Sequence, residues 1–233
     1  MTLRLRGPRL TRHVLSSEQL DALSLPIGDD GVAVGVDARG GPAVMGFHHP
    51  RPFEVLLIGG LWTAQVLALR LAATGARIAV ETGRPQVWTT LLHAVGGEGG
   101  VQGAMTVYDV GRVPALGATV GSPVVVIRDC GMKPPRGRVS SAPWQSVLTL
   151  LPYLSPVAPR LLRGAALTGV QRVSPQEARQ LGRMLTLSDP EVQALPSLGD
   201  GVTLWCAPKD RQFAKIQPTD AETGLLGVAR RLD

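Results

Sequence analysis

Two adjacent glycines, Gly59 and Gly60, lie where a chain can hold a phosphate group. They follow a short apolar run, Phe53–Ile58, and precede apolar residues at helical spacing: Leu61, Ala64, Leu67, Ala68, Leu71 and Ala72. After Gly75 comes a second apolar run, Ile78–Val80. A strand, a glycine turn, a helix and a second strand form the βαβ unit of a parallel sheet, which binds phosphate at the helix N-terminus.

The first template for such a turn is the P-loop, which has a glycine, four residues, a second glycine, a lysine and a serine or threonine. Counted from Gly59, it places Ala64, Gln65 and Val66 at the last three positions. The lysine holds the β- and γ-phosphates and the hydroxyl holds magnesium. Neutral Gln65 and apolar Val66 supply neither group, so the turn has P-loop spacing without the residues for ATP hydrolysis.

The second template is the dinucleotide fingerprint, with three spaced glycines and an acidic residue about 20 positions later for the ribose hydroxyls. Here Glu81 is well placed for the ribose, but Leu61 occupies the second glycine position, and the bulky Trp62 follows it. A side chain at Leu61 lies where the backbone must approach the pyrophosphate. A Rossmann-type enzyme that binds a dinucleotide or nucleotide-sugar through Glu81 is therefore the alternative hypothesis.

A purely structural interpretation is also open, in which Gly59 and Gly60 only make a tight turn. The helix dipole would still allow backbone amides from Leu61 to Thr63 to bind an anion weakly. We therefore predict no bound cofactor and leave residual nucleotide binding open.

The strongest strand signal, Pro123–Ile127, is a β-branched run of the kind found in fully buried parallel strands. With the residues that follow, PVVVIRD, it resembles a Walker B strand, and the resemblance gives Asp129 the place of the metal-holding carboxylate. Cys130 stands where an ATPase of this type has a catalytic glutamate. The segment AALTGVQ resembles a sensor strand that ends in a polar residue, Gln171.

These residues must be positioned by a sheet with helices around it. We predict an α/β domain with a doubly wound, mostly parallel sheet of P-loop or Rossmann-like topology. A β-hairpin is expected within 28–45 and another at Gly201–Ala207 and Gln212–Ile216. Further strands are predicted at Met105–Tyr108 and Ala165–Val170, and helices at 17–23, 85–95, 144–153 and 174–187.

Composition narrows the classes of function. The net charge is +6, and nearly all of it comes from scattered arginines without interleaved aromatics, so nucleic acid binding is not favoured. We interpret Arg84, Arg211 and Lys215 as residues of a solvated surface, and the loop Lys133–Arg138 as a contact for an acidic partner.

The two cysteines form no metal-binding cluster. We expect a cytoplasmic location and no transmembrane segment, because the longest apolar stretch is too short.

Three further segments resemble the FtsK/SpoIIIE class of translocation ATPases, which includes those of type VII secretion. They are the entry GVDARGGPAVMGFHHPRPFEVLLIGG, the helix QRVSPQEARQLGRMLTL and the closing hairpin LGDGVTLWCAPKDRQFAKIQPTDAE. The resemblance implies a secretion or DNA-translocation machine at the inner face of the membrane. It leads us to expect a basic extension over 1–27, one degenerate P-loop-like domain over 28–222 and a tail over 223–233.

The favoured hypothesis is a non-catalytic pseudo-ATPase that acts as an interaction subunit. Its expected partner is an active ATPase or a membrane secretion or translocation complex. The vestiges of its nucleotide site would be Gly59, Gly60, Thr63, Gln65, Glu81, Asp129 and Gln171.

Overall fold

The computed structural model describes residues 31–96, 104–137, 139–208 and 210–229 and shows a ten-stranded sheet. Its order is β2-β1-β10-β9-β8-β3-β7-β6-β4-β5. In that order the strands are Pro42–Met45, Val32–Val36, Arg211–Lys215, Val202–Cys206, Leu167–Val170, Phe53–Ile58, Gln145–Leu151, Val124–Asp129, Arg77–Thr82 and Met105–Tyr108. The helices are α2 (Leu61–Ala73), η1 (Pro85–Trp88), α3 (Thr89–Gly96), α4 (Ala158–Gly164), α5 (Pro175–Leu185), α6 (Asp189–Ala194), η2 (Leu195–Ser197) and α7 (Asp220–Leu226).

The strands from β8 to β5 are parallel, whereas β9, β10, β1 and β2 are joined by antiparallel pairings. The predicted doubly wound, mostly parallel sheet is therefore confirmed, and so are the two hairpins. In the N-terminal hairpin Val32 pairs with Met45, and in the C-terminal hairpin Arg211 pairs with Cys206. The first hairpin joins the second where Val36 of β1 pairs with Lys215 of β10.

The prediction of a helix over 144–153 was wrong, because this segment forms β7. All seven residues of β7 are buried, and the strand pairs in parallel with β3 on one side and β6 on the other. A parallel strand covered on both faces needs no alternation of polar and apolar residues. Its leucine-rich sequence therefore carried no period that distinguishes a strand from a buried helix.

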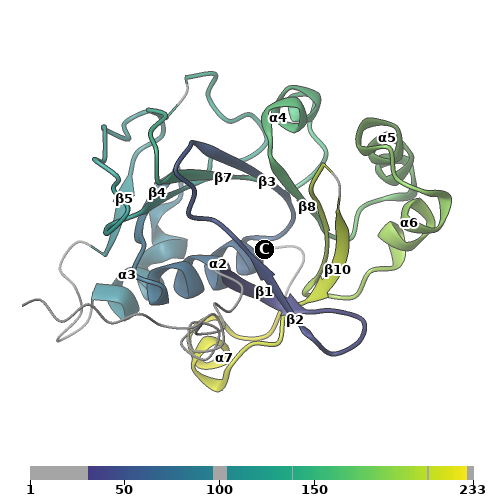
Figure 1. Ribbon diagram of the computed structural model, residues 1–233, viewed down its shortest axis with the longest axis horizontal. Helices are drawn as coiled ribbons and strands as arrows, with labels where there is room; N and C mark the ends of the chain where they lie inside the picture. The colour runs from purple at the N-terminus through teal and green to yellow at the C-terminus, as the bar shows by residue number, and fades with distance from the viewer. Residues whose placement is uncertain (1–30, 97–103, 138, 209, 230–233) are drawn as a thin grey trace, which may run out of the picture.

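Helices cover the two faces of the sheet unequally (Figure 1). On the α2 face, α2 and α3 pack against apolar side chains such as Leu57, Ile127 and Leu148. On the α4 face, α4 and α5 cover Leu56 and Ile58 at the β3–β8 part of the sheet. Over β4 and β6 that face is covered by residues of the loop that follows β5, including Val113, Leu116 and Ala118.

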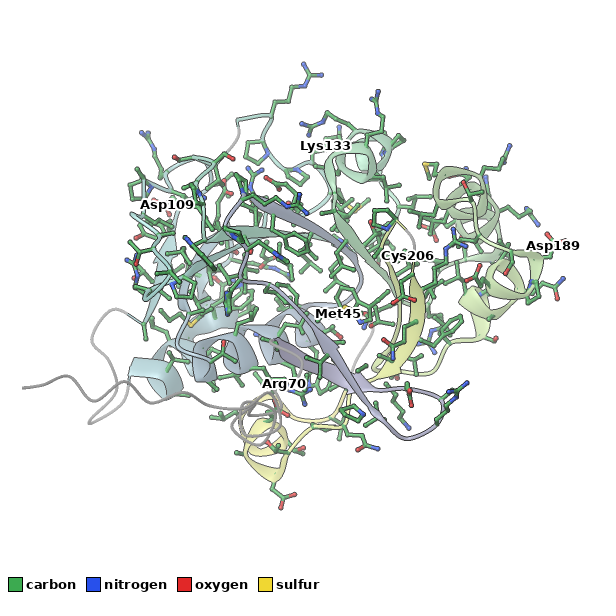
Figure 2. The ribbon with its side chains drawn as sticks, viewed as in Figure 1. Met45, Arg70, Asp109, Lys133, Asp189 and Cys206 are labelled. Carbon is green, nitrogen blue, oxygen red and sulfur yellow. The ribbon has the colours of Figure 1, made fainter. Side chains whose placement is uncertain are left out.

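The first and the last described segments of the chain meet beside α2. Arg70 of α2 forms an ion pair with Glu222 of α7 and donates to the carbonyl oxygens of Ala33 and Gln217 (Figure 2). Trp62 donates its indole N–H to the carbonyl of Gly227. The expected boundary between residues 222 and 223 falls within α7, and the boundary at 27 lies outside the described residues, as does the helix expected over 17–23.

Helix α5 follows the sequence prediction most closely. Ser174 caps its N-terminus and accepts from the backbone N–H of Glu177, whose carboxylate accepts from the backbone N–H of Ser174 in return. The predicted helix over 85–95 begins as a 3-10 turn, η1, before α3. The short helices α4, α6 and α7 were not predicted, since each spans only six or seven residues.

We expect Leu148→Ala in β7 to lower the free energy of unfolding by about 2–5 kcal/mol. Leu148 is fully buried, and the smaller side chain would leave a cavity that the neighbouring side chains fill only in part. Urea denaturation measures the change. Val120→Ala is the control, since Val120 is 71% exposed and its loss should cost less than about 0.5 kcal/mol. Equal effects of the two substitutions would contradict a central position for β7.

Candidate functional site

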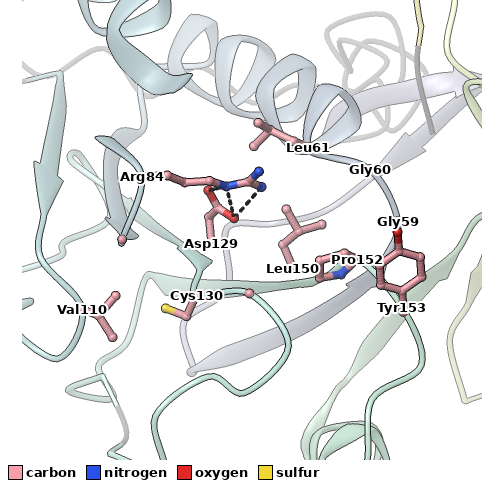
Figure 3. A pocket seen from close by; sticks show the side chains of 12 residues that line it. Gly59, Gly60, Leu61, Arg84, Val110, Asp129, Cys130, Leu150, Pro152 and Tyr153 are labelled. Atoms are coloured by element: carbon pink, nitrogen blue, oxygen red, sulfur yellow. Dashed lines mark hydrogen bonds and ion pairs between the residues drawn. The ribbon is translucent and has the colours of Figure 1, made fainter. Parts of the chain in front are cut away.

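A cavity of about 470 Å³ lies at the carboxyl ends of the parallel strands, where open α/β sheets bind ligands. Gly59 and Gly60 after β3, Arg84 after β4 and Asp129 at the end of β6 line it (Figure 3). Leu150 and Pro152 from the end of β7 lie between them. The sheet therefore brings the glycine turn and the predicted metal-holding carboxylate to one cavity.

The turn itself is shorter than a P-loop. Strand β3 ends at Ile58 and α2 begins at Leu61, so Gly59 and Gly60 alone connect them. In a P-loop the whole motif stands between the strand and the body of the helix. Here the template positions from Leu61 to Val66 already belong to α2, so no loop remains to surround a phosphate chain.

The side chain of Gln171, which follows β8, packs against the glycine turn. Its side-chain oxygen accepts from the backbone N–H of Gly60 at 2.7 Å, and its nitrogen donates to the hydroxyls of Thr63 and Thr203. A Cβ on Gly59 would lie 2.6 Å from the same Gln171 oxygen, so the close contact requires glycine. The predicted residues Gly59, Gly60, Thr63 and Gln171 are thus brought together, and Gln171 forms hydrogen bonds with Gly60 and Thr63.

Gln65 and Val66 are directed elsewhere. Gln65 donates its side-chain N–H to the carbonyl of Val87 in η1 at 2.7 Å. Val66 is fully buried and packs with Trp62 and Ile216. Neither residue lines the cavity, so the positions that carry the lysine and hydroxyl in the template do not face the place of a phosphate.

Asp129 is held by an arginine. The guanidinium of Arg84 donates to both carboxylate oxygens, with Nε at 3.0 Å from Oδ2 and Nη2 at 2.9 Å from Oδ1 (Figure 3). The indole N–H of Trp88 and the hydroxyl of Thr82 donate to Oδ2 as well, at 3.0 and 3.1 Å. The Asp129 side chain is only 1% exposed, so its charge is neutralised within the protein.

Arg84 is the cavity-lining residue whose ion pair the sequence analysis did not predict. It was interpreted as part of a solvated surface, and its side chain is indeed 36% exposed. The signal for its role was its position just after β4, since β4 and β6 are adjacent parallel strands that end side by side at Thr82 and Asp129.

Glu81 lies on the other face of the same strands. It is 1% exposed, accepts from Arg128 Nε at 2.5 Å and from the backbone N–H of Gly111 at 2.8 Å. Both carboxylate oxygens are therefore engaged. Strands β3 and β4 are also separated by β7 and β6, whereas the dinucleotide-binding fold places its first two strands side by side. Neither observation favours the ribose-binding alternative.

Cys130 lines the cavity beside Asp129 but is poorly suited to reaction. Burial, followed by the negative charge of Glu81, raises the pKa of its thiol to about 12. The thiolate is the reactive form of cysteine, so the thiol stays protonated at neutral pH.

Among the described residues, no group of three or more histidine, cysteine or acidic side chains is arranged to bind a metal ion. No helix in the described ranges has the length and apolar character needed to cross a bilayer.

Comparison with known proteins identifies the fold. Neither a protein-family model nor a curated protein sequence matches this chain. The structure is similar to VirB4 of Thermoanaerobacter pseudethanolicus, with a TM-score of 0.58 and 10% sequence identity over 84% of this chain and 99% of that chain. The genome packaging NTPase B204 from Sulfolobus turreted icosahedral virus 2, solved with sulfate, gives a TM-score of 0.49 and 14% identity over 73% and 98%. At such identities the likeness to VirB4 shows a shared fold.

We expect Arg84→Met to lower the free energy of unfolding by about 1–3 kcal/mol, because it leaves a buried carboxylate with only two neutral donors. Chemical denaturation measures this loss. The matched control is Arg172→Met, which removes the ion pair between Arg172 and Asp200. These two side chains are 44% and 47% exposed, so the substitution should lower the free energy of unfolding by less than about 1 kcal/mol. An Arg84 effect no larger than the control would contradict a structural ion pair.

We expect Cys130 to react with iodoacetamide at least about a hundredfold more slowly in the native protein than in urea at pH 8, because its pKa of about 12 leaves little thiolate. The rate should rise with pH up to that value. Mass spectrometry of the modified peptide follows the reaction. Rapid modification of native Cys130 at pH 8 would show that the thiol is activated.

Proposed function

We propose that this chain is a non-hydrolysing, P-loop-like domain that acts as an interaction subunit of a translocation or secretion machine. The observation that carries the proposal is the ion pair between Arg84 and Asp129. In P-loop enzymes an aspartate at this strand end holds magnesium. Here the guanidinium of Arg84 supplies the positive charge in place of the ion, so the negative charge of Asp129 is already neutralised.

The short turn supports the same conclusion. Phosphate binding needs backbone amides that surround the anion and a lysine that reaches it. The amide of Gly60 already donates to Gln171, and Gln65 donates to a carbonyl of η1. The residues proposed as vestiges of a nucleotide site therefore have structural partners, and their hydrogen bonds stabilise the fold.

The cellular context is proposed from two sources. Three segments resemble FtsK/SpoIIIE translocation ATPases, and the fold is shared with VirB4. A domain that keeps the sheet and its helices can still pack against active neighbours after it has lost hydrolysis. We propose an active ATPase or a membrane secretion complex, such as a type VII system, as the partner, at the cytoplasmic side of the membrane.

Calorimetric titration of the purified chain with ATP and magnesium, and with ADP, tests the proposal. We expect no heat of binding and no release of phosphate. Saturable binding of magnesium-ATP with measurable phosphate release would overturn the pseudo-ATPase assignment, whatever partner the chain has.

A sharper test restores the motif residues. We expect the double variant Gln65→Lys/Val66→Thr to remain unable to bind magnesium-ATP, because both positions point away from the cavity and the turn is too short. Binding is measured by calorimetry and folding by thermal unfolding. Nucleotide binding gained by a folded double variant would mean that the side chains, and not the turn, are what the site lacks.

A further inference from the structure

No helix of the described residues lies over β7 on the α4 face of the sheet. A crossover between adjacent parallel strands usually contains a helix and is right-handed. The crossover from β7 to β8 contains α4, and the connection from β6 to β7 runs in the same direction across the sheet. A helix in that connection would therefore lie on the α4 face, but the described residues between β6 and β7 form none.

A cleft of about 340 Å³ lies where that helix would be. Its floor is formed by the sheet, with Leu56 of β3 and Val147 and Thr149 of β7. These three side chains are 1%, 6% and 4% exposed. One wall is α4, and the other is the loop between β6 and β7, which contains Lys133 at the edge of the molecule (Figure 2).

Each wall carries an exposed arginine. Arg160 belongs to α4 and Arg136 to the loop, and within the described part of the chain neither guanidinium has a hydrogen-bond or ion-pair partner. A third arginine, Arg128, also lines the cleft, but it is already neutralised by Glu81. Among the described lining residues only Glu54 is acidic, so the cleft has a surplus of positive charge.

The loop that carries Arg136 is attached to the sheet. Arg128 donates to the carbonyl oxygens of Pro135 and Gly137, at 3.4 and 3.3 Å. The ion pair with Glu81 holds Arg128 itself in place. The two residues flanking Arg136 are therefore anchored to a buried side chain, which holds the loop wall in a defined position opposite α4.

We propose that this cleft binds an acidic, partly apolar segment of a partner protein, which lies over β7 in place of the absent crossover helix. The apolar floor fits aliphatic side chains, and the two arginines fit carboxylates on either side of them. A single-stranded nucleic acid would instead be expected to stack on aromatic side chains, and none is among the described lining residues. The proposal goes beyond the proposed function and does not depend on the nucleotide site.

Fluorescence anisotropy with a labelled helical peptide of leucine, alanine and glutamate tests the cleft. The double variant Arg136→Glu/Arg160→Glu should bind the peptide at least about tenfold more weakly than the unaltered chain. The control Arg179→Glu/Arg183→Glu makes the same charge change at exposed α5 positions outside the cleft. Its affinity for the peptide should lie within about twofold of that of the unaltered chain. Equal losses in both variants would show general electrostatic attraction and overturn the proposal.

A second variant tests the cleft without changing charge. Gly164 lies at the end of α4 and lines the cleft, and a Cβ there would meet no atom within 4 Å. Gly164→Trp should therefore fold normally, fill the cleft and weaken peptide binding as strongly as the double charge reversal. Unchanged binding by a folded Gly164→Trp protein would place the peptide elsewhere on the surface and overturn the proposal.

Three other probes separate the possible ligands. A peptide with lysine in place of glutamate should not bind, and neither inorganic phosphate nor single-stranded DNA should displace the acidic peptide at moderate salt. Displacement of the peptide by phosphate would reveal a simple anion site. If the chain bound DNA more tightly than the peptide, and the cleft variants lost this DNA binding, the cleft would be a nucleic acid site. Either result would overturn the peptide assignment and leave the test of nucleotide binding unaffected.

Discussion

Strand β7 sets the geometry on which the cavity and the cleft both depend. It pairs with β3 through Ile58 and Leu151 and with β6 through Arg128 and Thr149. The glycine turn and Asp129 are thereby held one strand apart, with the end of β7 between them. The same strand forms part of the floor of the cleft on the α4 face. All seven residues of β7 are buried, so the strand lies at the centre of the packed sheet.

The two ion pairs of β4 and β6 follow from strand geometry. Successive side chains point to opposite faces of a sheet, so Arg128 and Asp129 point to different sides of β6. Arg128 neutralises Glu81 of β4 on the α4 face, while Arg84 neutralises Asp129 on the α2 face. Each buried carboxylate thus has an arginine partner from the neighbouring strand or the residues just after it. An unpaired carboxylate at either position would have a large desolvation cost.

Much of the fold could be predicted from the sequence, because the glycine turn, the β-branched run and the capped helix α5 are local signals. The parallel sheet follows from them. Strand β7 could not be predicted, because a strand buried on both faces has no amphipathic period. Its identity is decided by the partner strands β3 and β6, which come from distant parts of the chain.

The sequence pattern placed several candidate residues at strand ends, but it did not give their partners. The positions of Gly59, Asp129 and Gln171 at strand ends followed from the pattern. That Gln171 would bond to Gly60, and Arg84 to Asp129, depends on which strands are adjacent. The sequence gaps of 111 and 45 residues between these partners lie beyond the reach of local motifs.

The pairing of β1 with β10 has a consequence for the order in which the molecule is built. Residues 32–36 are synthesised well before their sheet partner at 211–215. Within the described sheet, the N-terminal hairpin reaches the other strands only through β10. The hairpin therefore cannot dock on the sheet before residues 211–215 have been made, and its docking closes a contact of high sequence separation.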